Sequence, residues 1–540
     1  MKKHIRIIDI VKTVLIYVLT ASMLAMAGIY INARQNAGQR TEIPPEKQLI
    51  FGLGGSFFPE IDERHLYPVQ ITVTRGGESM SAVGNDSLIA RVYDNDAIRF
   101  AILMLFSSTT ERVIFDSLDN LDRLEGEMYW QAAAASDNSI YIRYAGDYIH
   151  PLIHAFLSNN FETMDTGGGP VVTLRELFIV DKDPVFGVTR DSQGNVAVFR
   201  PNSETLGRED MSARINASLQ VAYNNIVGGI PCRFLNSDII SGEQGANRNN
   251  IRNLRFCPSF HLLDHRLIYL PAISAENPLL DIAGNINLGN INTQENYIRQ
   301  LFRLLGFHHE RAYAVSSADL VTYRDVAQSV SFSNSGQIIY RNTEGLHLAR
   351  FLGTDAEYFT FFEKMRAASA FANALSSGLI GGSESRLHLT DILFNDENDE
   401  LTVIFAYYHA GTKVRINDTG GAVILRITQD GISEAVINTV RLTPLEIKRS
   451  INPILILSEA DRLISEYIAA HTEDGNNGTP GDLPSEVSET LSSVLNLRRG
   501  GTQSADGNFF VSRIELMYTI DLPNQYQGEL NEFSPEWVIK

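Results

Sequence analysis

Histidines with a thiol or a carboxylate nearby are the residues of this chain best suited to metal chemistry. His261 and His265 lie four residues apart, and Cys257 precedes His261 by four residues. On a helix this spacing would place both imidazoles on one face, and cysteine and histidine are preferred zinc ligands. The spacing matches no common zinc-binding pattern, so we interpret the segment as a polar loop with incidental histidines.

His308, His309 and Glu310 form a second group with the ligand types of a zinc protease. That chemistry needs the order H-E-x-x-H, which places two histidines one helical turn apart with a carboxylate beside them. Here the glutamate follows both histidines, and no further histidine stands at the required spacing. The chain also lacks the G-x-S-x-G and S-x-x-K patterns of serine nucleophiles. We therefore predict no catalytic, cofactor-binding or metal-binding residue.

Glycine-rich and acidic segments give no stronger signal. Residues 52–56 (GLGGS) lack the third glycine of a dinucleotide fingerprint and the lysine of a phosphate loop. The acidic run 396–400 (DENDE) lacks the glycine and the terminal glutamate of a calcium loop at their positions. We interpret the first segment as a turn and the second as a solvated hairpin tip.

Residues 13–31 contain no Asp, Glu, Lys or Arg and are long enough to cross a bilayer as one helix. The cationic flank precedes them, which favours a cytoplasmic N-terminus at residues 1–12 and an exported body. Ala25-Met26-Ala27 has the small-x-small form of a signal-peptide cleavage site, but the apolar run continues to Ile31. We predict a single-pass anchor in the cell membrane, and a cleaved signal peptide is the alternative. The flank consists of Lys2, Lys3, Arg6 and Lys12.

The composition is that of a folded protein with an acidic surface. The chain is 44% hydrophobic and 20% charged, with a formal net charge of −19 at pH 7. Binding to phosphate backbones requires a basic surface, so nucleic acid is excluded as a partner. About 500 exported residues are too many for one ordinary core, and two to four domains are expected.

Cys232 and Cys257 are the two cysteines of the chain. In an oxidising exterior they could form a disulfide that closes a loop of roughly 25 residues and contributes about 3 kcal/mol. Two thiols are an equally good interpretation, because sequence does not give the distance between their Cα atoms.

Turn and linker signals divide the chain into segments. A polar stretch ending in Pro44-Pro45 follows the anchor, Gly167-Gly168-Gly169-Pro170 interrupts the chain, and a third region begins near Gly345. We predict an α+β fold in a multi-domain exported body, with mainly antiparallel sheets and packed helices behind one transmembrane helix. The boundaries are a linker at 32–45, domains at 46–165, 166–344 and 345–540, and a mobile loop at 472–484 in the last domain.

Hydrophobic periodicity predicts the main elements. Residues 66–75 alternate like a strand, and a turn beginning at Asp191 predicts a hairpin between 184–189 and 195–199. Helical spacing predicts helices at 96–107, 147–157, 356–375 and 443–470, and extended patterns predict strands at 401–408, 412–416, 421–427 and 508–522.

Residues 304–342 resemble the central domain of the YycH regulatory proteins. The matching positions include Gly306-Phe307, Asp319 and the run Gly336 to Tyr340, but the D-G-T of that family is matched only by Asp319. A second stretch resembles the family from Leu401 onward, although Lys413 replaces a proline. The remaining matches are Arg311, Tyr313, Val321, Tyr323, Val330, Ser331, Phe332, Gly411, Val414, Ala422, Val423, Ile424, Gly431 and Ile432.

The resemblance implies a membrane-anchored protein that binds a cell-envelope sensor histidine kinase, YycG or WalK, together with a YycI-like protein. Contacts through the transmembrane helix matter in that family. Ala21, Ala25 and Gly28 fall on one helical face and would permit close approach of another helix. Small residues are common in any anchor, so this contact face is a hypothesis.

We therefore expect a non-enzymatic regulator in a two-component system, acting outside the cytoplasm by protein–protein contact and without a cofactor. One alternative is an envelope metal-dependent hydrolase using His261, His265 and His308. Another is an extracytoplasmic module that binds a solute or a peptide.

Overall fold

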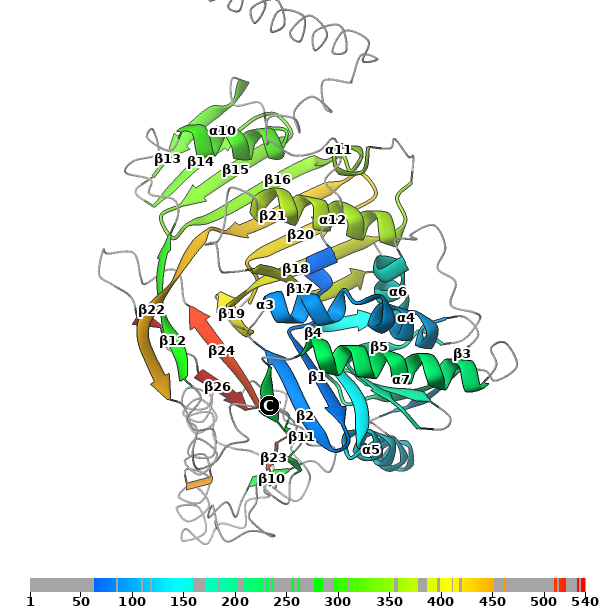
Figure 1. Cartoon of the computed structure of the whole chain (residues 1–540). Coiled ribbons are helices and arrows are strands. Elements are labelled where there is room, and N and C mark those ends of the chain that lie inside the picture. The colour runs from blue at the N-terminus through cyan, green and yellow to red at the C-terminus, as the bar shows by residue number, and fades with distance from the viewer. Residues whose placement is uncertain are drawn as a thin grey trace, which may run out of the picture. The chain divides into compact units, whose positions relative to one another are not determined.

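A computed structural model describes the chain between residues 63 and 539 (Figure 1). The predicted anchor, the linker and the loop 472–484 lie outside the described residues. The longer stretches outside the description are 1–62, 159–169, 202–207, 237–253, 263–275, 285–294, 377–385, 451–460, 463–508 and 521–531, with gaps of one to four residues elsewhere.

An eight-stranded antiparallel sheet occupies the first part of the described chain. It joins strands from both sides of the predicted boundary at 165/166. A 3-10 turn, η2 (Glu63–Leu66), precedes the first strand. In spatial order the strands are β3 (Thr110–Phe115), β7 (Val196–Pro201), β6 (Phe186–Arg190), β5 (Thr173–Val180), β4 (Asn138–Ile149), β1 (Gln70–Arg75), β2 (Glu78–Val83) and β8 (Ile230–Cys232).

Helices cover both faces of this first sheet, because alternate residues of its central strands are apolar on both sides. Gly187 of β6 faces Leu105 of α4, whereas Phe178 of β5 points to the opposite face and contacts Trp130 of α5. Further helices pack against β1, β2 and β4. The helices are α3 (Asp86–Tyr93), α4 (Asp96–Leu105), α5 (Asn120–Ala134), α6 (His150–Ser158) and α7 (Arg208–Asn225).

An eleven-stranded sheet forms the second large layer. It is antiparallel except where β19 pairs with β24 in parallel, and β17 pairs with β18 beside the main path. The order is β13 (Tyr313–Ser316), β14 (Leu320–Arg324), β15 (Gln328–Ser333), β16 (Gln337–Leu346), β21 (Ile432–Asn438), β20 (Val423–Ile427), β18 (Glu400–His409), β19 (Thr412–Ile416), β24 (Ile514–Ile520) and β26 (Glu536–Ile539), with β17 at Arg386–Asn395.

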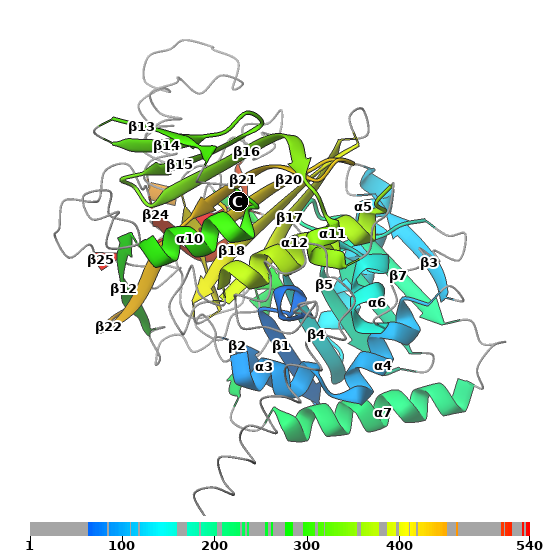
Figure 2. The ribbon, with the colours of Figure 1, turned by 90° about the horizontal axis from the view of Figure 1, so that it is seen from above.

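Helices α10 (Glu295–Leu304) and α12 (Phe361–Ser376) lie along the same side of the second sheet, and α11 (Ala349–Leu352) packs beside α12 (Figure 2). Phe302 of α10 contacts Phe332 of β15, with ring centroids 5.9 Å apart. In β15, β20 and β21 and in the first part of β16, most residues on this side are buried, while most of those that point to the opposite face are half-buried or exposed. The second sheet therefore has one face covered by helices, and its opposite face carries polar and half-buried side chains over β15, β16, β21 and β20. This part of the opposite face is here called the open face.

Strands β4 and β17 join the two sheets. Tyr148 donates a hydrogen bond to the carbonyl of Leu389, and Tyr408 of β18 donates one to the carbonyl of Ala145 over 3.3 Å. His65 of η2 bonds the Leu387 carbonyl at 2.7 Å. These bonds satisfy carbonyl groups that would otherwise be buried without a partner.

The predicted helix at 443–470 is wrong over its first part. Residues Val440–Ser450 form strand β22, which pairs with β12 (Glu276–Gly284) from a distant part of the chain. A partner strand overrides local helical spacing, because backbone hydrogen bonds and packing outweigh intrinsic propensity. The remaining short strands are β25 (Glu532–Phe533) beside β12, the pair β9 (Leu235–Asn236) and β11 (His261–Leu262), and the pair β10 (Leu254–Phe256) and β23 (Phe509–Val511).

The α+β class with mainly antiparallel sheets is confirmed. Helix α4 begins at the predicted residue, and the hairpin around Asp191 is present as β6 and β7. The helix predicted at 147–157 begins only at His150, so that Pro151 stands in its first turn, where its missing N–H costs nothing. None of the helices that the structure describes is long and apolar enough to cross a membrane.

Candidate functional site

Strand pairing places three arginines in one row across the open face of the second sheet. Side chains of directly paired residues point to the same face. The row runs from strand to strand as Arg324, Ser329, Arg341, Glu434 and Arg426. Arg341 and Arg426 each stand between buried residues of their own strands, so strand alternation directs them outward.

Glu434 forms ion pairs with two of these arginines. Its Oε1 lies 2.8 Å from Nε of Arg341, and its Oε2 lies 3.2 Å from Nη1 of Arg426. The glutamate side chain is 17% exposed, whereas the two arginine side chains are 67% and 54% exposed. Among the described residues, no hydrogen bond or ion pair engages the side chain of Arg324. The arginines of the row therefore expose to solvent further guanidinium N–H groups that are not bonded to Glu434.

A groove of about 690 Å³ lies over this row. The carboxylate of Asp325 accepts a hydrogen bond from the Val326 amide over 2.7 Å and belongs to the turn at one end. The groove thus holds three arginines and three acidic residues, and its surface is polar and mixed in charge. Its lining comprises Arg324, Asp325, Val326, Ala327, Gln328, Ser329, Arg341, Asn342, Thr343, Glu400, Arg426, Ser433 and Glu434.

An apolar row runs parallel to the arginine row on the same open face. Ile339, Val436 and Ile424 each stand two residues from Arg341, Glu434 and Arg426 on the same strands, and strand pairing makes them neighbours. Ile404 of β18 pairs with Ile424 and continues the row. All four are half-buried, although they point away from the helices that cover the other face. Arginine is enriched in protein interfaces, and the buried core of an interface is more apolar than the rest of the surface.

The residue types of the groove favour binding. Arginine offers a fork of N–H donors that matches the two oxygens of a carboxylate or a phosphate. None of the thirteen lining residues is His, Cys or Lys, so this groove lacks the usual partner that activates a serine or threonine hydroxyl. What the groove supplies is recognition of polar or acidic groups.

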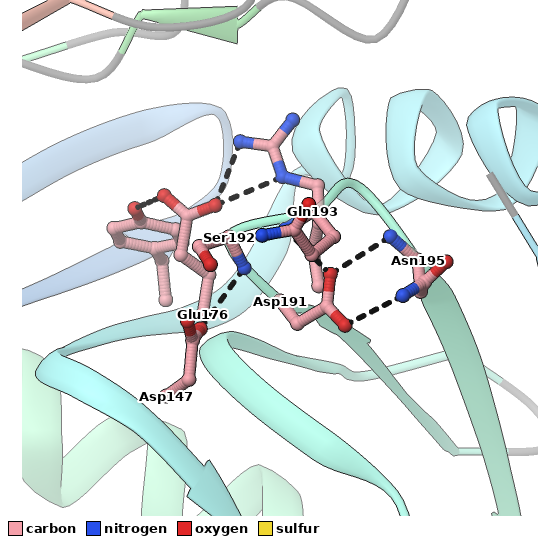
Figure 3. A network of polar contacts seen from close by, with 8 residues as sticks. Asp147, Glu176, Asp191, Ser192, Gln193 and Asn195 are labelled. Carbon is pink, nitrogen blue, oxygen red and sulfur yellow. Dashed lines mark hydrogen bonds and ion pairs between the residues drawn. The ribbon is translucent and has the colours of Figure 1, made fainter. Parts of the chain in front are cut away.

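A second polar network lies between α5 and the first sheet (Figure 3). Glu176 accepts a hydrogen bond from the Tyr141 hydroxyl over 2.7 Å and two from Arg190, over 2.9 and 2.7 Å. The guanidinium of Arg190 lies 4.4 Å from the ring centroid of Trp130. Burial raises the pKa of Tyr141, and so does the charge of Glu176. Tyr141 is therefore a hydrogen-bond donor here, and the network anchors α5.

The hairpin between β6 and β7 continues this network. Asp191 accepts hydrogen bonds from the backbone and side-chain amides of Asn195, over 2.9 and 2.8 Å. Asp147 accepts one from the amide of Ser192 over 2.9 Å (Figure 3). Burial raises the pKa of Asp191, against the effect of the Asn195 bonds. These carboxylates satisfy backbone donors of a turn, which is a positioning role.

The structure places few of the residues singled out in the sequence. Cys232 is buried at the end of β8, and His261 lies in β11. Cys257, His265 and His308 lie outside the described residues, as do Ala21, Ala25 and Gly28. Within the part of the chain that the structure describes, no group of three or more His, Cys, Asp and Glu is arranged to hold a metal ion.

The arginine row had no counterpart in the sequence reasoning. Arg324, Arg341 and Arg426 are separated by 17 and 85 residues and share no motif. Each does follow the strand alternation, which marks the residue as outward-facing. Only the strand register shows that the three side chains are neighbours.

The comparisons with known proteins add little. No protein-family model matches the chain, and no curated protein matches it. One solved structure that it matches is an uncharacterized protein from Eubacterium rectale, at 13% identity and a TM-score of 0.29. That match covers 49% of this chain and 77% of the other.

Proposed function

We propose that this chain is a membrane-anchored, extracytoplasmic regulatory protein that acts by protein–protein contact rather than by catalysis, and that its contact surface is the open face of the second sheet. The observation that carries the proposal is the pairing of the arginine row with the apolar row on that face. A partner with apolar residues and carboxylates at matching positions would bury Ile339 and Ile424 and engage Arg341 and Arg426.

The anchoring part of the proposal is supported by the sequence. Residues 13–31 are long and apolar enough for a transmembrane helix, and the cations before them favour an exported body. The resemblance of residues 304–342 to the YycH proteins supports a sensor histidine kinase as the partner. That segment includes β13 to β15 and the first part of β16, which contribute Ser329, Ile339 and Arg341 to the open face.

Affinity purification from detergent-solubilised membranes of a host that contains such a kinase tests the proposal. Three forms of the full chain are compared: the native chain, the Arg341→Glu/Arg426→Glu variant, and Arg303→Glu as a matched control. Arg303 is exposed on α10, over the covered face of the same sheet. We expect the kinase, detected by immunoblot, with the native chain and the control, and at least about tenfold less with the double variant, because each buried charge pair that is reversed costs several kcal/mol.

Replacing residues 1–31 by a cleavable signal separates the contribution of the anchor. Recovery of the kinase with the native anchor only would place the contact in the transmembrane helix and would overturn the open face as the contact surface. Equal recovery with the double variant and the control would overturn it as well. Absence of a kinase from all purifications would remove the kinase from the proposal.

A further inference from the structure

Strand β13 is the outermost strand of the second sheet, and none of the described strands pairs with its other edge (Figure 1). All four of its residues are exposed, and two are large and apolar: Tyr313 is 61% exposed and Val315 is 54% exposed. Natural proteins protect such edges with proline, inward charges or bulges. β13 contains neither proline nor a charged residue, and its pairing with β14 has no bulge.

The strand register shows which backbone groups of β13 point outward. The amide of Ser317 bonds the carbonyl of Leu320, which closes the β13–β14 hairpin. In an antiparallel pair, hydrogen-bonded positions alternate, so Val315 and Tyr313 also exchange both bonds with β14. Ala314 and Ser316 therefore direct their N–H and C=O groups away from the sheet. No backbone hydrogen bond within the described chain reaches these groups of Ala314 and Ser316.

Two exposed arginines lie at one end of this edge. Arg311 precedes the strand by two residues and is exposed, and Arg324 is the direct partner of Tyr313. Neither arginine side chain has an ion pair among the described residues. Acidic residues also lie near this edge in the sequence. Asp325 follows Arg324 and accepts a hydrogen bond from the Val326 amide over 2.7 Å, and Asp319 lies in the hairpin turn at the other end, where it accepts from Asn334. Glu310, before Arg311, lies outside the described residues.

We infer that β13 is an acceptor edge for an extended segment of a partner protein, one that carries apolar residues toward Tyr313 and Val315 and a carboxylate toward Arg311 and Arg324. Main-chain hydrogen bonds to Ala314 and Ser316 supply affinity, and the side chains supply selectivity. This inference deepens the proposed function and rests on it, because the added strand extends the open face.

The test uses a fluorescein-labelled peptide, Glu-Thr-Val-Thr-Val-Thr-Glu, and the full chain in detergent. In an added strand its valines and glutamates all point to one face, which is the face of Tyr313, Val315 and Arg324. Ala314→Pro removes an outward N–H and leaves the bonds between β13 and β14 intact, since proline is tolerated at a sheet edge. Ala314→Thr keeps the N–H and is the matched control. By fluorescence anisotropy we expect Ala314→Pro to bind at least about tenfold more weakly than the native chain, and Ala314→Thr to bind equally well.

Three results would overturn the inference: no saturable binding to the native chain, equal binding by the proline and threonine variants, or equal binding of a peptide with lysine in place of glutamate. A dimer of the native chain that Ala314→Pro abolishes, detected by light scattering, would assign the edge to a second copy instead. The Arg341→Glu/Arg426→Glu variant changes the open face and leaves the β13 edge intact. If this variant loses the kinase but still binds the peptide, the open face and the strand edge act independently.

Discussion

Gly146 of β4 lies directly against the backbone of Thr390 in β17, where the two large sheets meet. Both strands are irregular at this point. The pairing of β4 with β5 shifts between Arg143 and Tyr148, and that of β17 with β18 shifts between Leu389 and Asp391. Bulges bend a strand and redirect its side chains. Two facing bulges and a residue without a side chain allow the backbones of the two sheets to touch.

Substitution of Gly146 by alanine should destabilise the whole protein. A Cβ at this position would overlap the carbonyl group of Thr390, which is backbone and cannot rotate away. We expect a loss of about 2–4 kcal/mol in the free energy of unfolding, measured by urea titration. Gly187→Ala is the matched control, because the atoms nearest to its Cβ would belong to the end of the Leu105 side chain and not to backbone. Similar losses in the two variants would contradict the close junction.

His150, at the start of α6, should make the stability depend on pH. It is buried between the rings of Phe106 and Phe199, and its Nδ1 accepts a hydrogen bond from the Val172 amide over 3.1 Å. Burial, together with the nearby charge of Arg112, lowers the pKa of His150 from 6.5 to about 4.

A base whose pKa is lower in the folded state binds protons more readily when the chain is unfolded. The contribution of His150 is therefore complete above pH 6.5 and is lost as the pH falls toward 4, by up to about 3 kcal/mol. In His150→Asn an amide oxygen can accept from Val172 and does not titrate. The difference in stability between the native chain and this variant should shrink by that amount between neutral and acid pH, and a constant difference would argue against a neutral buried imidazole.

Lys364 of α12 is buried, and its carboxylate partner among the described residues is Asp399. Its Nζ lies 3.0 Å from Asp399 Oδ1 and donates to the Asp399 carbonyl over the same distance. Asp399→Asn keeps the size and the left-handed backbone of this residue but removes its charge. We expect it to cost about 2 kcal/mol, and Lys364→Met to cost less than about 1 kcal/mol, because an unpaired buried cation is worse than an apolar replacement. Thermal unfolding measures both, and the reverse order would contradict this account.

Sequence patterns correctly predicted the elements that depend mainly on residues close together in the chain. Helix α4 follows from its spacing and Asp96, and the β6–β7 hairpin follows from the turn residues after Asp191. Strand β22 was missed because its pairing with β12 depends on residues more than 150 positions away. The histidines were considered as metal ligands because of their residue type, not because of a matching motif. His261 lies in a two-residue strand, and no metal-binding group is present among the described residues.

The candidate site could not be predicted from the sequence, because it also depends on pairing between distant strands. Alternation in β16 and β20 shows that Arg341 and Arg426 face outward, but not that they flank one glutamate. That depends on the register of β16, β21 and β20, which is set by the buried rows on the other face. A one-residue slip in β21 would bury Glu434 and disperse the row.

Glu434 should act as a restraint on binding by the open face. Its carboxylate holds one nitrogen of Arg341 and one of Arg426, so an acidic partner must compete with it. Glu434→Gln removes the charge and keeps the shape. Because both arginines are more than half exposed, we expect a change in unfolding free energy below about 0.5 kcal/mol.

The effect on binding is measured with fluorescein-labelled hexaglutamate by anisotropy. At low ionic strength, binding to Glu434→Gln should be about threefold stronger than binding to the native chain. This gain should disappear at about 1 M salt, where the screening length is about 3 Å. Arg341→Gln, which removes one of the two cations, should weaken the same binding. Equal affinity for hexaglutamate in all three proteins would show that the arginine row does not recognise carboxylates.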